Sequence, residues 1–115
     1  MSNKRLLFIP VSSPQGIGEY MRSLLLAQSL ESECLGSLNI HFVLNKHTNY
    51  AKNCPYDTTL LERSATKERD KVCEVIADFK PDIVIFDCAG RAAHMKAAKK
   101  VGAKVVFISQ HAKKR

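Results

Sequence analysis

The stretch that decides the fold runs from Arg5 to Gly18 and reads RLLFIPVSSPQGIG. Its first half, Arg5 to Val11, is almost continuously apolar, which is typical of a strand buried on both faces of a parallel sheet. Its second half, Ser12 to Gly18, supplies turn residues, and a helix is predicted to follow from Ile17 to about Cys34. The helix is indicated by one apolar stripe, formed by Ile17, Met21, Leu24 and Leu25.

The rest of the chain alternates in the same way between short apolar strands and helices. Further strands are predicted over 39–44, 82–87 and 104–109, and a shorter one over 58–61. Helices are predicted over 67–79 and 91–101, the first stopped by Lys80-Pro81 and the second by Gly102. The polar segment 45–57 is predicted to be a loop with room for one helical turn. This order, without hairpin signals, predicts an α/β fold: a Rossmann-like α/β/α sandwich with a parallel sheet of about five strands.

Length and composition indicate one globular domain over residues 1–115. The chain is 45% hydrophobic and 25% charged, and its longest apolar runs fall far short of the roughly 20 residues that span a bilayer. Its four cysteines contain no Cys-x-x-Cys pair, so reduced thiols in a cytoplasmic protein are expected, with no zinc site and no other metal or cofactor.

The net charge of +7 raises the question of an anionic partner. The basic residues are spread along the chain, and the C-terminal cluster lacks the interleaved aromatic side chains that stack on bases, so nucleic acid is not the expected partner. Two interpretations stay open: solvated helix faces, or attraction to a phosphate-bearing ligand or to an anionic membrane surface, which would place the protein at the inner face of the membrane.

Candidate site residues follow from the position of the loops, because ligands of parallel α/β sheets bind at the carboxyl ends of the strands. Three places satisfy this rule. They are the first glycine loop with Ser13, Gly16 and Gly18, the end of the fourth strand at Asp87, and the segment after the fifth strand at His111. Each has an alternative: the glycines serve a tight turn, Asp87 caps the next helix, and His111 belongs to an exposed tail.

Glu19 is the candidate catalytic base. It lies one residue after Gly18, in the first turn of the predicted helix, where the helix dipole stabilises a carboxylate. A carboxylate there could accept a proton or a hydrogen bond from a hydroxyl group. The alternative is an ordinary first-turn acid without a chemical role.

The run from Gly16 to Ala27, GIGEYMRSLLLA, resembles a signature of the pseudaminic-acid-pathway UDP-sugar hydrolases, glycine-x-glycine-His-x-x-Arg-x-Leu-x-Leu-Ala. Relatives of that family include the peptidoglycan N-acetylglucosaminyltransferase, and both have the two-domain glycosyltransferase B fold. The stretches from Phe79 to Asp87 and from Ala98 to Val106 look like the later part of the family's N-terminal domain. The family's histidine after the second glycine is replaced here by Glu19.

The resemblance implies an N-terminal, acceptor-side domain of a sugar-nucleotide-dependent glycosyltransferase of cell-surface polysaccharide synthesis. Gly16 and Gly18 would face the acceptor, an acceptor sugar or a lipid-linked sugar. The UDP-sugar would be held by a C-terminal domain or a partner subunit, so the 115-residue chain is expected to be inactive alone. Two alternatives remain: a UDP-sugar hydrolase of the pseudaminic type, which Glu19 in place of histidine disfavours, and a non-catalytic flavodoxin-like interaction domain.

Overall fold

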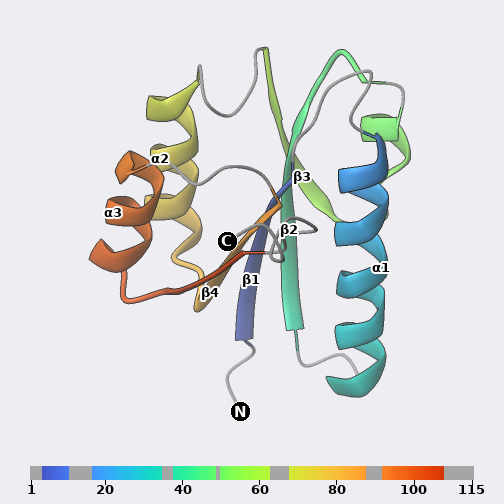
Figure 1. Ribbon diagram of the computed structural model, residues 1–115, viewed down its shortest axis with the longest axis horizontal. Helices are drawn as coiled ribbons and strands as arrows, with labels where there is room; N and C mark the ends of the chain where they lie inside the picture. Colours follow the sequence, from blue (N-terminus) through green and yellow to red (C-terminus); the bar gives the residue numbers. More distant parts are fainter. Residues whose placement is uncertain are drawn as a thin grey trace, which may run out of the picture.

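The computed structural model contains one sheet of five parallel strands in the order β3-β2-β1-β4-β5 (Figure 1). It describes residues 4–10, 17–34, 38–48, 50–62, 68–87 and 92–107. The strands are β1 (Lys4–Pro10), β2 (Leu38–Asn45), β3 (Asp57–Leu61), β4 (Ile83–Asp87) and β5 (Lys104–Phe107). The α/β class and the five-stranded parallel sheet are therefore confirmed.

Three α-helices cover the two faces of this sheet. They are α1 (Ile17–Cys34), α2 (Arg69–Phe79) and α3 (Ala92–Lys100), and a short 3₁₀ helix, η1 (Tyr50–Asn53), precedes β3. Figure 1 shows α1 on one side of the sheet and α2 with α3 on the other, which gives the predicted three layers. The predicted helical turn in the loop before β3 corresponds to η1.

The apolar run of β1 is explained by its central position. Leu6 and Phe8 pack into the core under α1, whereas Leu7 and Ile9 pack into the core under α2 and α3. All four side chains are at most 3% exposed. A strand covered on both faces has no position for a polar residue, so its sequence cannot alternate.

An aromatic group fills the layer between α1 and the sheet. Phe8 and Phe42 stack at 4.9 Å between ring centroids, and Phe42 stacks on Tyr56 at 5.7 Å. Tyr20 of α1 meets Phe42 edge-on at 6.0 Å. The Tyr56 hydroxyl donates to Glu31 Oε1 at 2.9 Å, which ties the C-terminal half of α1 to the segment that leads into β3.

The predicted boundaries agree with the structure to within two residues wherever they can be compared. The helix predicted over 67–79 begins at Arg69, the helix over 91–101 spans Ala92–Lys100, and the strand over 104–109 is observed to Phe107. Residues 67, 91, 108 and 109 lie outside the described residues. The third strand, predicted over 58–61, is β3.

The predicted apolar stripe indicated the helix α1 correctly, but only part of the stripe faces the core: Leu24 packs against it. Met21 and Leu25 are 42% and 61% exposed, whereas Tyr20, Ser23 and Ala27 are buried. Small side chains at Ser23 and Ala27 let the helix lie close to the sheet, and Tyr20 reaches the Phe42 ring. Because α1 carries leucines around most of its circumference, apolar spacing alone did not select the packed side.

Left-handed residues end two of the helices. Lys80 follows α2 with φ of 53°, and its N–H donates to the carbonyl of Ile76 at 3.0 Å before the buried Pro81. Gly102 follows α3 with φ of 79°, a conformation that glycine adopts without strain. The ends of both helices were predicted, from Lys80-Pro81 and from Gly102.

Two other expectations concern cysteines and membranes. Cys54 and Cys73 are free thiols, as predicted. Among the helices that the structure describes, none has the length and apolarity needed to cross a bilayer.

Candidate functional site

The strand order reverses between β1 and β4. From β1 the chain proceeds outward through β2 to β3, then crosses back to place β4 on the other side of β1 and continues to β5. The helix after β1 lies on one face of the sheet, and the helix after β4 lies on the other (Figure 1). The carboxyl ends of β1 and β4 therefore form the topological switch point, where sheets of this kind bind ligands.

Three of the predicted site positions belong to elements that meet at this edge. Asp87 is the last residue of β4 and is paired in register with Pro10, the last residue of β1. Gly18 and Glu19 lie in the first turn of α1, the helix that follows β1. The sheet thus brings the ends of two strands 77 residues apart in sequence side by side. The remaining predicted residues, Ser13, Gly16 and His111, lie outside the described residues.

The chemistry available at the start of α1 follows from its backbone. The first N–H groups of an α-helix have no partner within the helix, and the helix dipole adds partial positive charge at this end. With 18 residues, α1 is the longest of the described helices, and it begins at the carboxyl edge of the sheet. Its first turn can donate hydrogen bonds to a sugar hydroxyl, a carboxylate or a phosphate oxygen.

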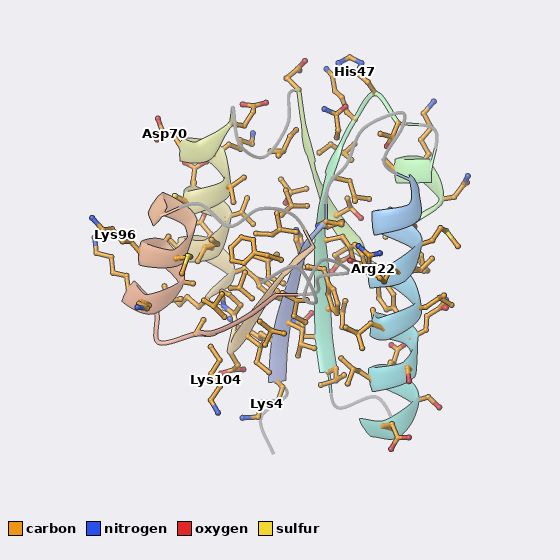
Figure 2. The ribbon with its side chains drawn as sticks, viewed as in Figure 1. Lys4, Arg22, His47, Asp70, Lys96 and Lys104 are labelled. Carbon is orange, nitrogen blue, oxygen red and sulfur yellow. The ribbon has the colours of Figure 1, made fainter. Side chains whose placement is uncertain are left out.

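Two polar residues one turn further along α1 were not predicted as parts of the site. Ser23 is fully buried, and its hydroxyl has no hydrogen-bond partner among the described residues. Arg22 is half-buried, and its side chain projects from α1 on the side of the sheet in Figure 2. Both stand within the run from Gly16 to Ala27 that carries the family resemblance, and that run was the only sequence signal for them.

A second group of polar side chains lies at the carboxyl ends of β2 and β3. Lys46 Nζ lies 2.6 Å from Glu62 Oε2, and His47 Nε2 lies 3.9 Å from Glu62 Oε1. The hydrogen bond from Lys46 lowers the pKa of Glu62 below its ordinary value. All three side chains are exposed, and His47 stands at the outer end of the molecule in Figure 2. These ion pairs join the ends of β2 and β3, away from the switch point.

Metal chemistry receives no support from the described part of the chain. No group of three or more His, Cys, Asp or Glu side chains there could hold a metal ion. The described features of the site are the backbone donors at the start of α1 and the adjoining carboxyl ends of β1 and β4.

Comparison with protein-family models and with curated proteins gives no match to this chain. The switch point, the residues at it and the resemblance of the glycine loop are therefore what point to a function.

Proposed function

We propose that this chain is the acceptor-binding N-terminal domain of a sugar-nucleotide-dependent glycosyltransferase of cell-surface polysaccharide synthesis. The observation that supports the proposal is the start of α1, with Gly18 and Glu19 in its first turn, following β1 at the switch point beside Asp87. Backbone donors and carboxylates together match the donor and acceptor pattern of sugar hydroxyls. The resemblance of the run from Gly16 to Ala27 is the reason to propose a sugar rather than another ligand with hydroxyl groups.

In this proposal each residue has a separate role. Gly18 permits close approach of the acceptor to the first turn of α1, and Glu19 acts as the base that accepts a proton from the attacking hydroxyl. Asp87 accepts a hydrogen bond from a second hydroxyl, and Ser13, Gly16 and His111 complete the acceptor site. The UDP-sugar is held by a second domain or subunit, so the chain by itself binds acceptor without catalysing transfer.

The test is a ligand-observed NMR titration of the 115-residue chain with a panel of acceptor sugars, UDP and UDP-N-acetylglucosamine. Binding of a sugar with little response to UDP is expected. Gly18→Val and Glu19→Ala should each weaken sugar binding about tenfold or more. The first variant blocks the close approach of the sugar, and the second removes one hydrogen bond to a charged group. Glu33→Gln is the matched control, since Glu33 is an exposed acid in the last turn of the same helix.

The same titration separates the alternatives. UDP-sugar binding that strengthens in Glu19→His, which restores the histidine of the resembled family, would favour the hydrolase. Failure to bind any sugar or nucleotide in a chain with a native circular dichroism spectrum would contradict the proposal and favour a non-catalytic interaction domain. Equal weakening by Glu33→Gln would show that the effect does not come from the first turn of α1.

A further inference from the structure

The amino edge of the sheet, opposite the switch point, carries a dense basic surface that we call the amino-edge patch. Its members are all exposed, and each lies at the start of a strand or the end of a helix. They are Lys4, Arg5, Lys80, Lys99, Lys100 and Lys104. Lys4 and Lys104 extend from the same edge, away from the body of the protein (Figure 2).

Backbone hydrogen bonds hold the patch together across three strands and two helices. The Asp82 N–H donates to the Arg5 carbonyl at 2.8 Å, and the Lys104 N–H donates to the Asp82 carbonyl at 2.9 Å. Lys80 precedes Asp82 by two residues. The turn after Lys100 is closed by the Gly102 N–H, which donates to the Lys99 carbonyl at 3.0 Å. The backbone positions that carry these basic side chains are therefore fixed along one edge.

Few negative charges oppose them. Among the described residues, the acids that share this part of the edge are Asp78 and Asp82, and one Asp82 carboxylate oxygen accepts the Arg5 N–H at 2.9 Å. Glu31 and Glu33 lie near the end of α1, which covers the opposite face of the sheet, and Asp57 begins β3 at the far edge. Helix dipoles favour cations at Lys80, Lys99 and Lys100, but they give no reason for Lys4 or Lys104, which begin strands.

The kind of positive charge favours a lipid surface over nucleic acid. The Arg5 guanidinium donates from Nη1 to the Phe79 carbonyl at 2.9 Å and lies over the Phe79 ring at 5.9 Å, so it is already engaged within the protein. The other five members are lysines, which act as point charges and lack the planar fork that reads phosphate bidentately. No exposed aromatic ring accompanies them in the described residues to stack on a base.

We propose that the amino-edge patch docks the protein on an anionic membrane surface. The attraction is electrostatic and peripheral, with each lysine contributing about a fivefold gain in affinity near an anionic lipid surface. The carboxyl ends of the same parallel strands then face away from the bilayer, so the switch point stays open to water, an orientation that fits a water-soluble acceptor sugar rather than a lipid-linked one. The proposal does not depend on sugar binding, which is measured separately.

The test is co-sedimentation with vesicles of phosphatidylcholine, and with vesicles in which about a third of the lipid is phosphatidylserine. We expect binding to the anionic vesicles only, weakening steeply as ionic strength rises. The triple variant Lys99→Gln, Lys100→Gln, Lys104→Gln should bind about 100-fold more weakly. The matched control carries the same charge change at Lys52, Lys71 and Lys96, which are exposed residues outside the patch, and should lose less than about fivefold.

Three outcomes would overturn the proposal. They are equal binding to neutral vesicles, equal loss in both triple variants, and binding of an oligonucleotide that needs the patch while anionic vesicles fail to bind. If the first triple variant unfolds, the double variant Lys4→Gln, Lys104→Gln replaces it, because these two residues lie at exposed strand starts and leave the end of α3 unchanged. About a 25-fold loss of affinity for the anionic vesicles is expected.

Discussion

His41 illustrates how the fold sets the chemistry of a single residue. Its Nε2 lies 2.7 Å from the Thr59 hydroxyl on the neighbouring strand, and its ring lies 5.2 Å from the Phe79 ring. Burial lowers the pKa of His41 below 6.5, while the nearby Asp57 carboxylate raises it in part. The half-buried imidazole is held by this packing and this hydrogen bond, and the folded state favours its neutral form.

This pKa shift makes stability depend on pH. The unfolded chain binds a proton at His41 near the ordinary pKa of about 6.5, whereas the folded chain binds it only at lower pH. The free energy of unfolding should therefore decrease as pH falls from about 6.5 through the lowered pKa of His41. Urea unfolding at a series of pH values measures this. His41→Gln should remove this part of the slope and His47→Gln should retain it; an unchanged slope in His41→Gln would refute the assignment.

Ser23 offers a second test at the scale of one residue. Its buried hydroxyl has no partner among the described residues, so the folded state loses the hydrogen bonds that water supplies to it in the unfolded state. Ser23→Ala should raise the free energy of unfolding by about 1 kcal/mol. Ser29→Ala, at an exposed position of the same helix, should change it by only a few tenths of a kcal/mol. A loss of stability in Ser23→Ala would indicate that the hydroxyl is bonded.

At the scale of elements, α2 ends on a strained residue. Lys80 has φ of 53°, a region that costs residues with a Cβ about 1 kcal/mol or more. Lys80→Gly should stabilise the protein by about 0.5–1 kcal/mol, because relief of this strain exceeds the added freedom of the unfolded chain. Lys99→Gly, inside the last turn of α3, should instead destabilise by about 1 kcal/mol. Thermal unfolding of both variants measures these changes. A loss of stability in both would show that Lys80 is not strained.

The sheet itself is covered unequally on the side of α1. Phe8, Ile85 and Val106 are aligned across β1, β4 and β5, and their exposure rises from 0% through 3% to 43% toward the edge. Val84→Ala, at a fully buried position of β4 on the opposite side, under α2 and α3, is the reference for full burial and should cost about 2 kcal/mol. Val106→Ala should cost less than about 1 kcal/mol, because less apolar area leaves water at that position. Equal costs would mean that β5 is buried in solution.

For the whole molecule, strand order predicts a gradient of local stability. β1 is bonded to a strand on each side and covered on both faces, whereas β3 and β5 each have one neighbour. Hydrogen exchange of the amides should be slowest in β1 and fastest in β3 and β5. Exchange in β5 as slow as in β1 would contradict this order. The control is exchange within α2, where the amides of Val72 and Ile76, whose side chains are buried, should exchange more slowly than the amide of Ala77, whose side chain is exposed.

Much of the fold could be predicted because its signals are local. The bounds of α1 followed from the turn residues before Ile17 and the apolar spacing after it, and Pro81 and Gly102 marked where α2 and α3 end. Gly18, Glu19 and Asp87 were predicted at the carboxyl edge because parallel strands place all their carboxyl ends there. Ser23 and Arg22 were missed, since a serine and an arginine inside a leucine-rich helix have no local mark of their environment.

The sequence by itself thus determined how many strands and helices form, their succession along the chain and the parallel sense of the strands. These features depend on residues near one another in the chain. Only the tertiary structure decided that β4 lies beside β1, that Tyr20, Ser23 and Ala27 form the packed side of α1, and that Lys4 and Lys104 share one edge. Those features depend on pairing between distant segments. Several pairings satisfy the same local pattern, and only burial of both sheet faces in one packed core selects among them.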